Sequence, residues 1–473
     1  MGAAEAFAQA PPLNESIVIG AWTFRPSLEA RLRGEYRNDP FGFDQVYGVG
    51  PTGGGGAVLA DAYNSNLPPN FSTSIGAPSE GWAIAERVRL GLAVDRGPVT
   101  AVLKLQDARV LGGAVNIGNI PYFFNESAPG SGFAPYEVYL DVHARSGRPM
   151  FLRLGRQAVQ WGDGRLIGTN DFTATGRVLD AARFGVEVGD FDFEAMAALL
   201  GIPYFGIADG NTENDERPMS GAQLYGLKIT GHFLPLLQVE ATGLARIARP
   251  PLPATLTPSD TFVIDGRVFG NHRGFQYSLE GAYQLGQVAS YGKNRSIEAF
   301  AVAGRFEWET ALPWHLTFGG QGAYASGDKG TGSPDEPMTR FDPILPDQTI
   351  NHSKMSLYAW SNLIEAGGDL SIRPIEEVGV SAGYRFVGLA DPKGRWITGA
   401  LTTVGADPTN ESIVLGHEID ATLRVTPWDP ITFQAGYGLF LLGDGGKNIL
   451  TAAQRPNSEM QHWGYLQATV KAP

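Results

Sequence analysis

Polar and apolar residues alternate along segments of ten or more residues, and this period of two constrains the fold more than any other feature. In residues 24–37, for example, Leu28 and Leu32 lie on one face, and Arg31 and Arg33 lie on the other. The same alternation recurs in residues 378–386, 418–426 and 431–441. Strands of soluble proteins usually have five or six residues, whereas ten or more match a tilted strand that crosses ~25 Å of hydrocarbon. The pattern therefore predicts an all-β fold, a transmembrane antiparallel β-barrel of the bacterial outer membrane.

Composition excludes several other classes of protein. The longest apolar run, about eight residues from Ala195 to Ile202, is far shorter than the ~20 residues of a membrane-spanning helix. The absence of cysteine from all 473 residues excludes disulfides, thiolate metal sites and a cysteine nucleophile. A net charge of −13 argues against a nucleic-acid partner. A soluble β-helix or propeller is the remaining alternative, but no internal repeat supports it.

The connections between the alternating segments are short and long in turn, as in barrels with short periplasmic turns and long extracellular loops. The short connections lie at residues 96–98, 146–149, 189–190, 232–235, 312–314, 373–377 and 427–430. The long connections, rich in Gly, Pro, Asn and Asp, lie at residues 38–81, 109–135, 158–176, 202–220, 327–361, 389–412 and 443–459. Aromatic residues near the segment ends match interfacial girdles, at Trp82, Tyr136, Trp308, Trp314, Trp428 and Trp463.

Counting the strands predicts a barrel of 18. Seventeen strands are evident. With this number, the connection 248–271 falls on the outer side of the membrane when the strands are counted from the N-terminus, and on the periplasmic side when they are counted from the C-terminus. One further strand at Thr261–Phe269, with Asp265 and Arg267 facing inward, removes this conflict. The total becomes even, as is usual for bacterial barrels, and both termini are then expected in the periplasm.

The N-terminus is expected to stand apart from the barrel. Ala6-Phe7-Ala8 has the small-residue pattern of a secretory cleavage site, which makes residues 1–15 a signal-peptide remnant or, alternatively, a disordered N-terminus. Residues 16–473 are then expected to form a single barrel in the outer membrane.

The most specific motif of the chain is residues 152–183, LRLGRQAVQWGDGRLIGTNDFTATGRVLDAAR. Its distinctive positions are Gly155, Arg156, Gln157, Gly162, Asp163, Gly164, Arg165, Gly168, Gly176, Arg177 and Asp180. With the EGAYQLG of residues 280–286 and the FDP of residues 341–343, this block resembles the alginate-export family of outer-membrane porins. The resemblance covers about residues 150–467. It implies an 18-stranded barrel that passes an anionic polysaccharide through a basic constriction.

Arginine outnumbers lysine by 28 to 8, and alternation places many basic side chains on the inner face. The predicted pore-lining residues are Arg25, Arg31, Arg33, Arg37, Lys104, Arg156, Arg165, Arg183, Lys228, Arg267, Arg305, Arg385, Arg424, Asp369 and Asp420. Guanidinium forks bind carboxylates bidentately, so neighbouring sites allow a polyuronate to move by exchange. The alternatives are that these residues form ion pairs that brace the wall, and that a GC-rich genome accounts for the arginine preference.

One pair of arginines departs from simple alternation. Arg153 and Arg156 differ in parity, so both cannot face the lumen from one regular strand. Arg156 is therefore placed where the strand gives way to the segment 158–176, which could fold inward.

These observations predict a channel for passive passage of an alginate-like or related anionic saccharide, and no enzyme. The sequence has no HExxH, GxSxG or P-loop spacing, and no cofactor or metal is expected; the acidic stretch 211–216 is interpreted as a solvated loop. Two alternatives remain, a general solute porin and a scaffold barrel that holds a partner from secretion or electron-transfer machinery. The expected partners are outer-membrane lipid, the saccharide and, for the scaffold, a periplasmic protein.

Overall fold

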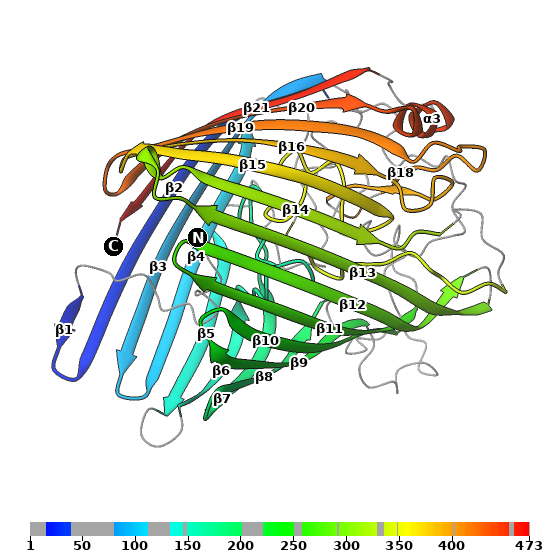
Figure 1. Cartoon of the computed structure of the whole chain (residues 1–473). Coiled ribbons are helices and arrows are strands. Elements are labelled where there is room, and N and C mark those ends of the chain that lie inside the picture. The colour runs from blue at the N-terminus through cyan, green and yellow to red at the C-terminus, as the bar shows by residue number, and fades with distance from the viewer. Residues whose placement is uncertain are drawn as a thin grey trace.

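The computed structural model describes residues 16–38, 80–111, 133–144, 149–200, 221–249, 258–290, 293–328, 335–347, 349–399, 401, 403–453 and 458–472. These residues form a closed barrel of 18 antiparallel strands (Figure 1). The predicted N-terminal remnant, residues 1–15, and the acidic stretch 211–216 lie outside the described residues. In the described ranges, no helix has the length and apolar character needed to cross a membrane.

The barrel strands follow one another around the wall in chain order. They are β2 (Trp22–Asn38), β3 (Glu80–Arg96), β4 (Val99–Leu111), β5 (Ala134–Ala144), β6 (Met150–Gln157), β7 (Leu179–Val188), β8 (Phe191–Leu199), β9 (Gly221–Leu234), β10 (Leu237–Arg249), β11 (Ser259–His272), β12 (Phe275–Ser290), β13 (Lys293–Glu309), β14 (Thr317–Ala325), β15 (Leu363–Ile375), β16 (Val378–Gly388), β19 (Val414–Trp428), β20 (Ile431–Leu442) and β21 (Met460–Ala472). The smaller elements are β1 (Ile17–Ile19), η2 (Pro313–His315), β17 (Trp396–Ile397), β18 (Thr403–Gly405) and α3 (Asp444–Ala452).

The barrel closes where its first strand meets its last. β2 pairs with β21 over a register that runs from Leu28 opposite Ala472 to Asn38 opposite His462. The short strand β1 pairs with the beginning of β2, where β21 has already ended. Closure leaves no long unpaired edge, which is the condition for a sheet to sit in hydrocarbon.

The strand count predicted from the sequence is confirmed. β11 contains the predicted strand at Thr261–Phe269 and pairs with β10 and β12 along its length. Asp265 and Arg267 are buried on its inner side, whereas Ile264, directly before Asp265, is 64% exposed on the outside. The alternation of the sequence thus becomes an inner and an outer face.

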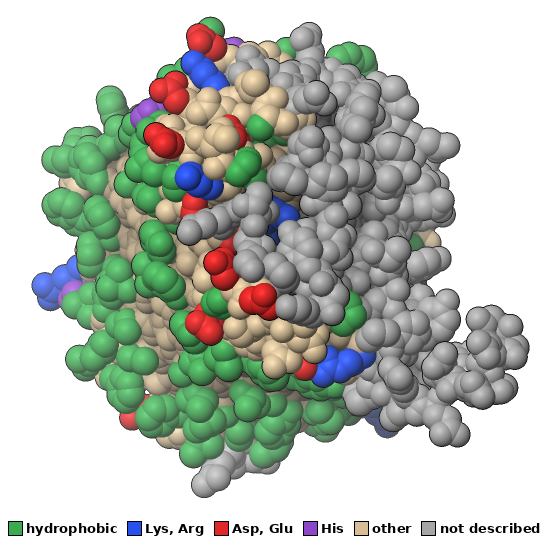
Figure 2. Space-filling view, turned by 90° about the vertical axis from the view of Figure 1, so that its right-hand side faces the viewer, with side chains coloured by type: hydrophobic (Ala, Val, Ile, Leu, Met, Phe, Trp, Pro, Cys, Tyr) green, Lys and Arg blue, Asp and Glu red, His purple; other side chains and the backbone are tan. Residues whose placement is uncertain are grey.

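The outer face of the barrel is apolar. Exposed side chains such as Leu32, Leu227 and Leu279 alternate along their strands with buried polar neighbours. In the view onto the long-loop end, hydrophobic side chains form the left and lower periphery, and most of the visible charged side chains lie within it (Figure 2). An apolar exterior around a polar interior is the pattern of a barrel in lipid.

The two ends of the barrel differ. At one end lie the short turns, such as Gly97-Pro98 between β3 and β4 and Asp429-Pro430 between β19 and β20, as the sequence predicts. At the other end lie longer connections and the helix α3 (Figure 1). Two of these connections turn into the barrel and pack against its inner wall, one at residues 158–178 and the other at residues 335–347 and 349–362. Their apolar residues, including Ile167 and Trp360, share one buried core with the wall.

Candidate functional site

The segment of residues 158–178, called here the first inward segment, begins where β6 ends. Trp161 packs into the space that Gly226 of β9 leaves open, and its indole nitrogen donates a 3.0 Å hydrogen bond to Glu194 of β8. The turn that follows needs glycine, because Gly162 and Gly164 have φ values of +55° and +78°. This backbone requirement explains part of the motif found in the sequence.

A glycine also allows the first inward segment to meet the second. A Cβ at Gly168 would lie 2.7 Å from both the backbone nitrogen and the Cβ of Asp347. The carboxylate of Asp347 accepts a 2.8 Å hydrogen bond from the backbone nitrogen of Asn170. Residues 335–347 and 349–362 are called here the second inward segment, and Asp347 joins this segment to the first one.

Ion pairs inside the barrel fix the first inward segment to the wall. Asp163 Oδ1 lies 3.0 Å from Nη1 of Arg267 on β11 and 3.3 Å from Nη2 of Arg305 on β13. Here the segment supplies the cation and the wall the carboxylate: Arg165 donates a 3.0 Å hydrogen bond to Glu280 of β12. Burial by itself would raise the pKa of Asp163, but the three surrounding guanidinium charges lower that pKa below its usual value. This network, whose segment side chains are almost completely buried, braces the segment.

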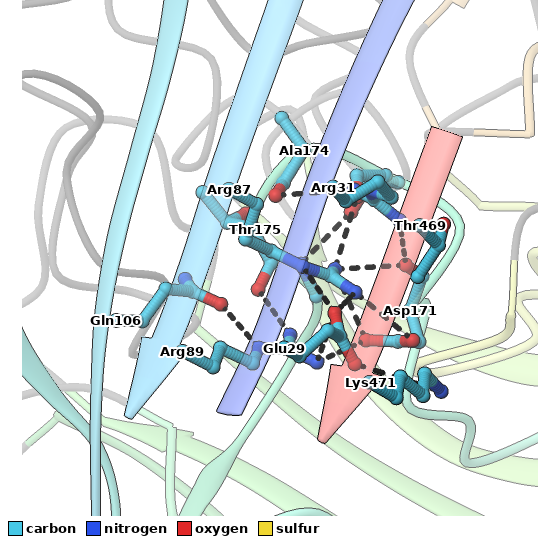
Figure 3. Close-up of polar contacts among 12 residues, drawn as sticks. Glu29, Arg31, Arg87, Arg89, Gln106, Asp171, Ala174, Thr175, Thr469 and Lys471 are labelled. Carbon is cyan, nitrogen blue, oxygen red and sulfur yellow. Dashed lines mark hydrogen bonds and ion pairs between the residues drawn. The ribbon is translucent and has the colours of Figure 1, made fainter. Parts of the chain in front are cut away.

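A second ionic contact holds the first inward segment to the opposite strands β2 and β3 (Figure 3). Asp171 Oδ1 accepts a 2.7 Å hydrogen bond from Nη1 of Arg89 and lies 3.1 Å from Nη1 of Arg87. Arg31 donates a 2.8 Å hydrogen bond to the backbone carbonyl of Asp171. Desolvation raises the pKa of Asp171, yet the guanidinium charges lower it well below its usual value. Asp171 therefore stays ionised as a counter-charge to the arginines.

An aromatic contact follows directly in the chain. Phe172 lies under the guanidinium of Arg33, with 3.8 Å between the carbon of the cation and the ring centre. The same ring meets Trp463 and Tyr465 of β21 edge-on, at centroid distances of 6.1 and 5.5 Å. The first inward segment thus packs against both β2 and β21, the two strands that close the barrel, through a cation–π contact and through aromatic contacts.

The second inward segment is held by the other half of the wall. His352 Nδ1 lies 2.6 Å from Glu365 on β15, and the hydroxyl of Ser353 donates a 2.7 Å hydrogen bond to Glu418 on β19. Lys354 lies 2.9 Å from Asp420 on the same strand. The sequence analysis placed residues 327–361 among the external loops. That expectation is corrected for residues 335–347 and 349–361, because polar residues among them have buried partners on the inner wall.

Most of the predicted pore-lining cations do face the interior, and most of them have partners there. The further ion pairs on the inner wall join Arg25 to Asp95, Arg37 to Glu35 of the same strand, Lys104 to Glu137, both Arg183 and Lys228 to Glu194, and Arg385 to both Asp369 and Asp420. Arg33 donates to Gln467. Arg424 differs from these residues, since it is exposed and has no hydrogen bond or ion pair with any described residue.

The predicted position of Arg156 is corrected. Arg156 was expected to line the lumen, but Gln157 takes the inward position, where it accepts a hydrogen bond from the inward Arg183. Arg156 therefore shares the outward face of Leu154 and pairs with Asp180 at 2.9 Å on the neighbouring strand. The parity conflict with Arg153 is resolved in favour of Arg153, which bonds Asp141 on the inner face at 2.8 Å.

Sequence reasoning missed three participants, namely Arg87, Arg89 and Asp171. The alternation of residues 84–92 was available as a signal for the two arginines, because Val88 and Leu90 separate and flank them. No local pattern marks Asp171, whose partners lie 82 and 84 residues away. Within the described ranges, no three His, Asp or Glu side chains gather as a group that could hold a metal ion.

The chain is similar to known outer-membrane proteins in sequence and in fold. The family model described as alginate export matches residues 82–455. No curated protein sequence matches the chain. Among solved structures, OccK11 (OpdR) of Pseudomonas aeruginosa is 10% identical with a TM-score of 0.54, over 95% of this chain and 96% of that chain. OccAB2 of Acinetobacter baumannii is 12% identical with a TM-score of 0.52, over 94% and 97%. At these identities the likeness to solved structures shows the fold alone.

Proposed function

Since the chain belongs to the alginate-export family of outer-membrane proteins, we propose that an anionic, alginate-like polysaccharide or related saccharide passes through its barrel. Family and fold are those of outer-membrane channels rather than enzymes, and the apolar exterior contacts membrane lipid. The proposal adds the charge class of the cargo and the residues that select it.

The observation that carries the proposal is a strip of arginines on the neighbouring strands β2 and β3. Arg31 on β2 stands directly opposite Arg87 on β3, and Arg89 follows two residues further on the same face. Like charges directly opposite each other destabilise a sheet unless an anion lies between them. Guanidinium groups bind carboxylates bidentately, so such a strip suits a polymer that carries one carboxylate per sugar.

The negative charge of the whole chain does not oppose this function. Selectivity follows the local field at the narrowest part of a channel, where low-dielectric walls focus it. Exposed charges more than a Debye length of ~8 Å from that point contribute little to the field there. The arginines of β2 and β3 therefore affect the selectivity of the channel more than the net charge of −13 does.

Electrophysiology tests the proposal. The purified protein is inserted into planar bilayers, and the current is recorded while oligomers of uronic acid or neutral glucose oligomers of equal length are added. We expect the uronate oligomers to interrupt the current at lower concentrations than the neutral ones. A general solute porin would respond equally to both, and a scaffold barrel to neither, so either result would contradict the proposal.

A further inference from the structure

We infer that Arg31, Arg87 and Arg89 form a carboxylate-binding subsite that Asp171 occupies in the resting protein, and that a carboxylate of the passing saccharide displaces Asp171. Asp171 is thus an internal stand-in for the ligand. The inference rests on the proposed function and adds to it a named subsite and a competition within the chain.

The geometry of the arginines calls for an anion at this place. Arg31 and Arg87 are register partners on β2 and β3, and their side chains leave the wall on the same side (Figure 3). Glu29 meets Arg87 with a 3.0 Å hydrogen bond from Nε and lies 3.7 Å from Arg89. Glu29 therefore pairs with two of the three guanidinium groups, Arg87 and Arg89, and Asp171 supplies the second negative charge of the cluster. The wall alone carries an excess of positive charge.

The contacts of Asp171 are those that a free carboxylate would make. Its Oδ1 accepts from Arg89 at 2.7 Å, and its Oδ2 accepts from Nη2 of Arg87 at 3.3 Å. Many of the remaining donors of the cluster are met by neutral backbone carbonyls, including those of Ala174 and Thr175. Hydrogen bonds to carbonyls are weaker than those to a carboxylate, so an incoming carboxylate gains by replacing them.

Exposure separates this contact from the brace at Asp163. The side chain of Asp163 is 2% exposed and that of its partner Arg267 is 4% exposed, so no ligand can reach this pair without unfolding the segment. The side chain of Asp171 is 46% exposed, although Arg87 beneath it is 2% exposed. Asp171 thus covers buried arginines from the open side. It is placed where a competing carboxylate can arrive.

The other groups that contact the cluster, Gln106, Tyr136 and Lys471, add no negative charge that could replace that of Asp171. Gln106 of β4 accepts a 2.7 Å hydrogen bond from Nε of Arg89, and the ring of Tyr136 lies 3.8 Å from the same guanidinium. Both are neutral and orient Arg89 toward Asp171. Lys471 of β21 lies 3.6 Å from Glu29 and adds positive charge at the edge of the cluster.

The test compares Asp171→Asn with the wild type in planar bilayers. The substitution keeps the shape of the side chain and removes its charge, so that the three arginines lose their internal competitor. We expect uronate oligomers to block Asp171→Asn at about tenfold lower concentration than wild type, which corresponds to about 1.4 kcal/mol. Neutral glucose oligomers should act equally on both proteins.

Asp163→Asn is the matched control, because it removes one carboxylate from the same inward segment at a buried pair. We expect this variant to melt at lower temperature without a tighter block by uronate oligomers. Arg87→Gln should weaken the block relative to wild type, which reports on the subsite independently of Asp171.

The outcomes separate the inference from the function on which it rests. If uronate oligomers block wild type but block Asp171→Asn no more tightly, Asp171 is only a brace and the inference is overturned. An equal tightening in Asp163→Asn would also overturn it, because any loosening of the segment would then suffice. If uronate oligomers block none of the proteins, the proposed function itself fails.

Discussion

The carboxylate of Asp163 lies 3.0 Å from a guanidinium nitrogen of Arg267, although 104 residues separate them in the chain. Both side chains are almost fully buried inside the barrel. The pair joins an inward-folded segment to a strand of the wall, so it decides the path of the segment through the interior.

Removing one partner of this pair should destabilise the protein strongly. Asp163→Asn leaves the buried Arg267 and Arg165 with fewer counter-charges, and breaking a buried pair costs about 3 kcal/mol. We expect a clearly lower melting temperature in detergent. The matched control is Asp260→Asn, whose partner Arg249 is 48% exposed, because exposed pairs contribute about 0–1 kcal/mol. Equal losses in the two variants would contradict the bracing role of Asp163.

Acid should release the inward segment only at low pH. The pKa values of Asp163 and Asp171 are lower than usual in the folded protein. Such groups stabilise the fold above their unfolded pKa of about 3.9, and this contribution is lost as the pH falls through the folded pKa. The difference in melting temperature between wild type and Asp163→Asn/Asp171→Asn should stay constant from pH 8 to pH 5 and shrink below about pH 4. A difference that disappears above pH 5 would refute this assignment.

Arg424 and Arg385 should respond differently to the same substitution. Arg385 is buried among Asp369, Asp420 and Glu365, whereas Arg424 is exposed and unpaired among the described residues. Arg424→Gln should therefore lower the permeability ratio of anions to cations and leave the melting temperature unchanged. Arg385→Gln should lower the melting temperature. A reversed result would make Arg424 the structural residue of the two.

The orientation of the barrel can be tested with single cysteines, since the chain has none of its own. The exposed Glu411 lies between β18 and β19 at the long-loop end, and the exposed Glu376 lies in the short turn after β15. A membrane-impermeant maleimide should label Glu411→Cys on intact cells and Glu376→Cys only after lysis. The buried position of Ser353→Cys should stay unlabelled in both cases. Labelling of Glu376→Cys alone on intact cells would reverse the topology.

The family resemblance and the strand count were accessible from the sequence because both depend on local patterns. Alternation along the chain assigns each residue of a strand to a face, and this correctly placed Arg267 and Arg385 inside. Arg156 was misplaced because the strand was expected to give way there to the segment 158–176, whereas β6 continues its alternation to Gln157 and turns Arg156 outward. Parity alone does not say where a strand ends.

By itself the sequence determined the barrel, its 18 strands and the charge of its inner face, because polar and apolar residues alternate with a period of two along the strands. Only the tertiary structure decided which of the inner charges are neutralised. Asp171 meets Arg89 and Asp163 meets Arg267 only because one connection folds into the lumen and not outward. That path depends on glycine turns and on contacts between residues about a hundred positions apart, and no local period encodes such contacts.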